Sequence, residues 1–176
     1  APPPVQDKIA MTTLTLEPKP QMGLMNKVRQ MLDTGQIDGA LSLLNISGQD
    51  GMIIRNARGV CLLRLGRAEQ AMKIFLDLCY PNGAVAIPQT TPTEFRANYV
   101  AALIRMHDPI IANAQLYYVL DHNHPSVVQL RHALRTWRRS LPWIARLLLL
   151  IGITPKQHVK LEFTPGWLWT PPQPRA

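Results

Sequence analysis

Apolar residues recur at steps of three and four along most of the chain, from Met22 to about Ile153. The recurrence is clearest in four sets: Leu24, Val28, Met31 and Leu32; Leu41 and Leu44; Val60 and Leu63; and Ala71, Phe75 and Leu78. This spacing places the apolar side chains on one face of an α-helix and leaves polar residues on the other. The pattern therefore predicts a series of amphipathic helices.

Short breaks separate these helices. The first three are expected to end near Gly35, Ser47–Gly51 and Leu65–Arg67, and Gly35 suits a left-handed helix cap. A longer connection, Tyr80–Pro92, contains three prolines and is expected to be a structured loop. Further helices are predicted at about 94–106, 109–121, 125–139 and 141–152. Because most breaks are short, neighbouring helices are expected to pack antiparallel, as helix hairpins.

Both ends of the chain differ from this helical body. Residues 1–20 are rich in proline, which forbids a continuous helix, and are expected to form an extended arm. Within this arm Met11–Glu17 has the β-branched, alternating pattern of a short strand, and Val159–Phe163 alternates in the same way. The two segments could pair with each other, or each tail could become ordered only on a partner.

The C-terminal tail, residues 154–176, combines prolines with Phe163, Trp167 and Trp169. Aromatic side chains gathered in this way are costly to expose to water, so the tail is expected to dock on a protein surface. That surface could belong to its own domain or to a neighbouring subunit. We favour the neighbouring subunit, because an extended Pro/Trp segment is a typical tether.

The helical body contains a repeated turn. Gly35–Ala40 aligns with Gly66–Ala71, and His107–Ala112 occupies the same place in a third copy. Glycine permits a tight reversal, and the small alanine five residues later lets the second helix of a hairpin approach the first closely. A large apolar residue four positions further on fills the groove between hairpins; these residues are Leu44, Phe75 and Leu116.

With these features the chain resembles the tetratricopeptide repeat family, whose period is about 34 residues. The middle copy matches the family pattern at Gly59, Leu62, Gly66, Ala71, Phe75 and Leu78. The resemblance covers about residues 21–125 and implies an all-α fold, a right-handed superhelix of about three helix hairpins. Residues 126–153 are expected to add a pair of capping helices, with extended arms at 1–20 and 154–176.

In the family, the first helix of each hairpin lines a concave face. Six residues lie at or beside the corresponding positions here: Asn26, Arg29, Asn56, Arg64, Asn98 and Arg105. Asn and Arg suit an extended peptide because they can bond its backbone and its carboxylates, although these could also be ordinary solvated positions. The clamp of Lys, Asn and Arg that captures a C-terminal carboxylate in some family members is largely absent. Together with Trp167 and Trp169 of the tail, the six residues form the predicted partner-binding set.

Charge is concentrated near the C-terminus. The chain has a formal net charge of +8, and residues 122–176 contain eight Lys or Arg against one acidic residue. The predicted anion-binding residues are Arg131, Arg135, Arg138, Arg139 and Trp137. They could meet an acidic protein surface, nucleic acid, or a membrane surface contacted through residues 141–153. The plainer interpretation is a capping helix that buries its leucines against the last hairpin and exposes its arginines to solvent.

The sequence offers little chemistry. His122 and His124 are two residues apart and no further ligand cluster accompanies them, so neither a metal site nor a cofactor is predicted. No catalytic arrangement or phosphate-binding glycine loop is present, and an enzyme is not expected. Cys61 and Cys79 are expected to be buried free thiols, which favours a reducing, cytoplasmic location. No signal peptide is recognisable at the N-terminus, and no apolar run is long enough to span a bilayer.

These observations lead to one preferred class of function. We expect a non-enzymatic protein–protein adaptor or scaffold that tethers itself into a larger complex through its terminal arms. The first alternative is a helical repeat that binds RNA or DNA through its basic C-terminal helix. The second is a peripheral membrane module that uses residues 141–153.

Overall fold

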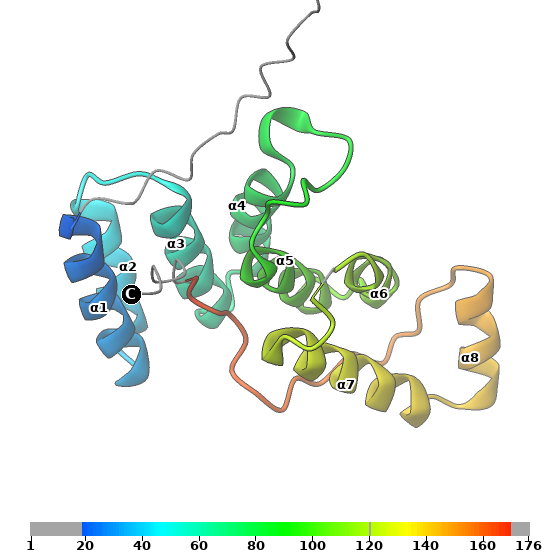
Figure 1. Ribbon diagram of the computed structural model, residues 1–176. Coiled ribbons are helices and arrows are strands. Elements are labelled where there is room, and N and C mark those ends of the chain that lie inside the picture. The colour runs from blue at the N-terminus through cyan, green and yellow to red at the C-terminus, as the bar shows by residue number, and fades with distance from the viewer. Residues whose placement is uncertain (1–18, 120, 170–176) are drawn as a thin grey trace, which may run out of the picture.

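The computed structural model describes residues 19–119 and 121–169 (Figure 1). This part of the chain is helical and contains no β-strand, which confirms the predicted all-α class. A 3-10 turn, η1, covers Pro81–Gly83. The α-helices in chain order are α1 (Lys19–Asp33), α2 (Ile37–Ile46), α3 (Met52–Arg64), α4 (Ala68–Cys79), α5 (Thr93–Arg105), α6 (Pro109–Tyr117), α7 (Pro125–Ser140) and α8 (Trp143–Leu150).

Helices α1 to α7 pack in chain order around one continuous core. Each packs against the next, and α1, α3, α5 and α7 also contact one another in sequence. The alanines of the three turn copies, Ala40, Ala71 and Ala112, are completely buried. A Cβ atom at Gly59 would lie 2.6 Å from the ring of Phe75, so α3 and α4 approach as closely as glycine allows. Small residues at these positions therefore set the distance between helices, as the sequence predicted.

The predicted turns keep one backbone conformation in all three copies. Gly35 and Gly66 both have a φ of +77°, which confirms the left-handed cap at the first turn. His107 stands where the third copy lacks glycine, and its φ is +64°. A histidine in this region is uncommon, because its Cβ crowds the backbone. The turn geometry is thus retained in the third copy without the residue that favours it.

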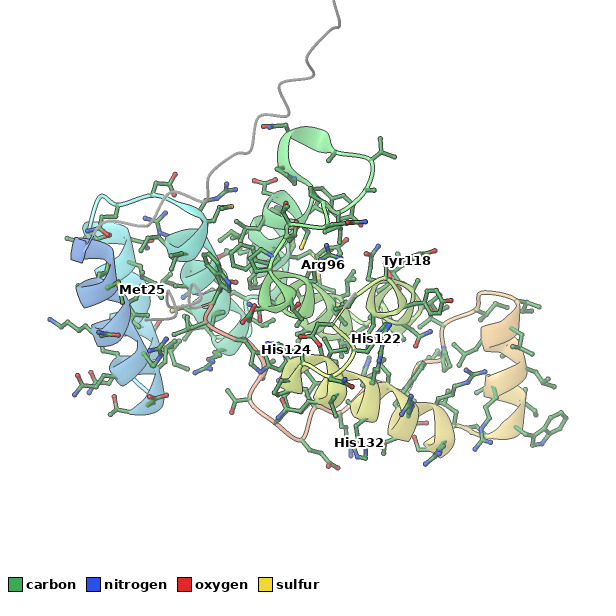
Figure 2. The ribbon with its side chains drawn as sticks, viewed as in Figure 1. Met25, Arg96, Tyr118, His122, His124 and His132 are labelled. Atoms are coloured by element: carbon green, nitrogen blue, oxygen red, sulfur yellow. The ribbon has the colours of Figure 1, made fainter. Side chains whose placement is uncertain are left out.

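The long connection between α4 and α5 is held to the helical body. Arg96 of α5 is buried, and its guanidinium donates hydrogen bonds to the carbonyl oxygens of Pro88 and Tyr118 (Figure 2). One side chain therefore joins the loop to the end of α6. The expectation of a structured loop is consistent with these bonds.

The two C-terminal helices behave differently from each other. Helix α7 packs on α5 and α6 and buries Val127, Leu130 and Leu134, as a capping helix should. Every residue of α8 is at least partly exposed, and the helix lies at one edge of the molecule (Figure 1). The expectation that this helix buries its leucines against the last hairpin is wrong. The extended backbone at Leu141, followed by Pro142, directs α8 away from the core.

The C-terminal segment runs back from α8 along α7 and across α5 and α3 (Figure 1). Val159, Leu161 and Phe163 pack against the core, whereas Lys160 and Glu162 between them are exposed. The prediction of a strand at 159–163 is therefore wrong, although buried and exposed side chains do alternate along this segment. One face of the extended segment is buried on helices instead of pairing with a second strand. The strand predicted at Met11–Glu17, like most of the N-terminal arm, lies outside the described residues.

None of the helices in the described ranges combines the length and the apolar character that crossing a membrane requires.

Candidate functional site

Two asparagines on neighbouring helices form the centre of the candidate site. Asn56 of α3 and Asn98 of α5 are both completely buried, and the Asn98 amide donates to the Asn56 side-chain oxygen at 2.8 Å. Both amides also donate to the carbonyl oxygen of Trp167, at 3.0 Å from Asn56 and 2.8 Å from Asn98. The Trp167 amide donates in return to the Asn98 oxygen at 2.7 Å. The pair therefore binds both backbone groups of one tail residue.

Arg64, in the last turn of α3, binds the two residues that precede Trp167. Its guanidinium donates to the carbonyl oxygen of Pro165 at 3.3 Å and to that of Gly166 at 3.0 Å. Burial lowers the pKa of Arg64 from its ordinary value, because a partly dehydrated site disfavours the charged form. The two carbonyl oxygens provide hydrogen-bond acceptors for the charged form. Hydrogen bonds to the backbone thus hold three consecutive tail residues.

The shape of the site restricts which side chains it accepts. Gly166 is buried with a φ of +100°, and a Cβ atom there would lie 3.0 Å from Val60. Both properties favour glycine. The Trp169 ring packs edge-on against Phe95, with 5.6 Å between ring centroids. The site therefore combines backbone recognition, which any sequence satisfies, with a requirement for glycine and a place for an aromatic ring.

The structure brings together five of the predicted partner-binding residues. Asn56, Arg64 and Asn98 surround the tail that carries Trp167 and Trp169. The other three predicted residues are exposed and take no part in these hydrogen bonds; they are Asn26, Arg29 and Arg105. Of the two surfaces predicted for the tail, the structure has it on the helices of its own chain and not, as we favoured, on a neighbouring subunit.

Three further site residues were not singled out from the sequence. Val60 and Phe95 carry the periodic apolar pattern of ordinary core residues, and Gly166 resembles any glycine in a loop. Each acquires a role only through a contact that is distant in the sequence, Gly166 with Val60 and Trp169 with Phe95. Nothing local in the sequence identified these three residues as part of the site.

The predicted anion-binding residues divide into exposed and enclosed members. Arg135, Arg138 and Arg139 are exposed on α7. Arg131 is half-buried and donates to the carbonyl oxygen of Leu116 and to the ring of His122. Trp137 is buried, and its indole donates to the Gln157 carbonyl at 2.7 Å. It therefore fixes the returning segment and is not presented for stacking beside the arginines.

His122 and His124 lie in the loop that precedes α7 (Figure 2). His124 makes a 2.7 Å hydrogen bond with the Ser126 hydroxyl, and its other ring nitrogen is 3.5 Å from Glu94. His122 interacts with Arg131. Across residues 19–119 and 121–169, no group of three or more His, Cys, Asp or Glu side chains is placed to hold a metal ion. These histidines connect α7 to α5 and to the loop before it.

Both cysteines are free and buried, which confirms that prediction. Burial raises the pKa of the Cys61 thiol to about 11 and that of Cys79 to about 12. Neither thiol is therefore a thiolate near neutral pH, and a thiolate is the nucleophilic form.

Comparison with known proteins gave no relative: no family model, no curated protein and no solved structure matched the chain. The tetratricopeptide resemblance accordingly stays a prediction.

Proposed function

We propose that this protein is a non-enzymatic protein–protein adaptor whose helical repeats hold an extended polypeptide segment. In this proposal the hairpins are tetratricopeptide-like and stack as a right-handed superhelix, with α3 and α5 on the concave face. The observation that carries it is the set of hydrogen bonds from Asn56, Asn98 and Arg64 to the backbone of residues 165–167. Side chains on the first helices of two successive hairpins thus bind an extended chain.

Backbone recognition makes the tail replaceable. Hydrogen bonds to carbonyl and amide groups are available to any extended segment, and specificity then comes from the side-chain positions. A partner segment that carries glycine at the position of Gly166 and an aromatic ring three residues later meets the same requirements. The tail is covalently attached, so it competes at an effective concentration in the millimolar range. A partner must therefore bind tightly or be attached through a second contact.

In this proposal the C-terminal tail also has a second role. When a partner segment occupies the groove, the tail with its two tryptophans is released and becomes available to the surrounding assembly. This retains the proposed tethering role of the C-terminal arm, now coupled to occupation of the groove. The role proposed for the N-terminal arm concerns residues outside the described part of the chain.

A displacement experiment tests the proposal. A fluorescent peptide with the sequence of residues 159–176 is titrated with wild-type protein and with the full-length variant Gly166→Ala, and binding is followed by anisotropy. The variant weakens docking of its own tail while the groove side chains stay unchanged, so it should bind the peptide at least about fivefold more tightly. The double variant Gly166→Ala/Asn98→Leu should lose this binding, because the groove itself is then altered.

The matched control is the same peptide with alanine at the position of Gly166. It should bind the Gly166→Ala protein much more weakly than the glycine peptide does. Equal binding of the two peptides, or equal affinity of the wild-type and variant proteins, would show that the groove does not exchange its occupant.

The nucleic-acid alternative is the weaker candidate. The exposed arginines of α7 could bind phosphates, but Trp137, one of the two tryptophans expected to stack on bases beside them, is buried.

A further inference from the structure

The outer surface of α8 is apolar and exposed. We define the α8 apolar face as Trp143, Ile144, Leu147, Leu150 and Ile151. These side chains are between 53% and 71% exposed. The first four lie on α8 and Ile151 follows its last residue, and their spacing places all five on one side, within roughly a third of the helix circumference. A continuous aliphatic and aromatic surface of this kind, without a polar residue inside it, indicates an interaction site.

The rest of the helix explains why this face stays outward. Leu148 and Leu149 are half-buried on the inner side. Arg146 bends back toward α7, where it donates to the carbonyl oxygens of Leu141, at 2.9 Å, and Arg139. Pro142 precedes the helix, and Gly152, with a φ of +81°, follows it. The chain therefore turns sharply at both ends, and α8 forms a short projection at the edge of the molecule (Figure 1).

The charge around this projection has one sign. Residues 122–161 contain seven Lys or Arg and no Asp or Glu. Arg135, Arg138 and Arg139 are exposed on α7, directly before α8, and Lys156 is exposed shortly after it. An occupant of this region must therefore be apolar where it meets α8 and negatively charged around it.

An anionic phospholipid surface has that chemistry. Nucleic acid is anionic but offers no apolar layer in which five such side chains could be buried. A helix of eight residues is about 12 Å long, far short of the bilayer core, so it can lie in the interface but cannot cross. Tryptophan favours the level of the lipid headgroups, and neighbouring arginines bind the phosphates. We propose that α8 inserts its apolar face into the boundary between headgroups and acyl chains of an anionic membrane.

Vesicle sedimentation with the full-length protein tests this. One set of vesicles is pure phosphatidylcholine, and the other contains roughly 30% phosphatidylserine, within the range where anionic lipid attracts basic residues. Wild-type protein should sediment with the anionic vesicles, and 0.5 M salt should weaken this binding by screening. The variant Leu147→Glu/Leu150→Glu should lose at least about tenfold in lipid affinity, since it places charge within the apolar layer. Replacing Arg138 and Arg139 by Glu should cost roughly fivefold per position or more.

Exposed positions elsewhere provide the control. Ile46, in α2, and Val85, in the loop before α5, are 83% and 101% exposed, so Ile46→Glu/Val85→Glu makes the same kind of change away from α8. This control should bind vesicles as the wild-type protein does, and circular dichroism should show the same helix content in all variants. Wild-type binding by the Leu147→Glu/Leu150→Glu variant would overturn the proposal. Absence of wild-type binding to the anionic vesicles would also overturn it. Light scattering in which the same variant converts an oligomer into a monomer would then identify α8 as a contact between copies.

Discussion

Asn98 is the residue whose replacement should most clearly separate tail docking from folding of the helices. It is completely buried and takes part in three hydrogen bonds, two with the backbone of Trp167 and one with Asn56. We consider Asn98→Leu, which keeps the branching at Cγ and removes the amide. The helix should tolerate the change, because leucine has the higher helix propensity.

The cost follows from which polar groups lose their partners. The Trp167 carbonyl keeps its bond from Asn56 at 3.0 Å, whereas the Trp167 amide and the Asn56 side-chain oxygen each lose a partner. A buried polar group without a partner costs about 1–3 kcal/mol, so two such groups cost about 2–6 kcal/mol if the tail stays in place. Burying leucine instead of an amide recovers part of this, which leaves about 2–4 kcal/mol.

The tail can avoid this free-energy cost by leaving the groove. If it leaves the groove, water satisfies both polar groups and the loss is limited to the free energy of docking. We therefore expect release of the tail with the helices still folded. In hydrogen exchange, the Trp167 amide should lose its protection, while the amides of α3 and α5 keep most of theirs. The free energy of unfolding in urea should fall by no more than the figure above.

Asn26→Leu is the matched control. Asn26 was predicted to face the same groove, but it is exposed on α1, so the substitution should leave the protection of Trp167 unchanged. The reasoning is refuted if Asn98→Leu leaves the Trp167 amide as protected as in the wild-type protein. It is also refuted if the helices and the tail lose protection together and by the same amount, since docking and folding would then be one process.

Three other predictions concern backbone space and thiol ionisation. Gly166→Ala should weaken tail docking by about 1–3 kcal/mol, seen as faster exchange of tail amides, because alanine is strained at a φ of +100° and crowds α3. Gly59→Ala should lower stability in urea by about 1–3 kcal/mol, since its Cβ would lie 2.6 Å from a phenylalanine ring. Burial raises the pKa of Cys61 to about 11 and of Cys79 to about 12, so neither should react with an alkylating reagent in native protein at pH 8. Because these pKa values are raised on folding from 9.0, their contribution to stability is complete below pH 9 and falls as the pH rises toward 11 and 12.

Control variants separate backbone strain from crowding in these glycine substitutions, and a contrary result can be named for the thiols. Gly152→Ala meets open space at a φ of +81°, so it should show backbone strain without crowding and leave the tail docked. Gly23→Ala, in α1 and also in open space, should stabilise the protein by roughly 0.5–1 kcal/mol. Equal effects of Gly59→Ala and Gly23→Ala would contradict the close approach of α3 and α4. Rapid alkylation of Cys61 in native protein at pH 8 would contradict its burial.

The sequence by itself determined the helices and their turns. Amphipathic periodicity and glycine turns are local properties, since they depend on residues within one or two helical turns of each other. The tetratricopeptide resemblance predicted one partner-binding face for six residues. Of these, Asn56, Arg64 and Asn98 meet at the tail, whereas Asn26, Arg29 and Arg105 take no part in those hydrogen bonds.

What these faces contact was decided by the tertiary structure. Asn56 and Trp167 are 111 residues apart, and nothing near either residue indicates the other. The alternation at 159–163 correctly marked one buried face, but the same pattern fits packing on helices or pairing with a strand. The leucines of α8 and the ring of Trp137 were misplaced for the same reason. Periodicity reports that a surface is apolar, whereas its partner depends on how the chain turns at Pro142 and returns across α7, α5 and α3.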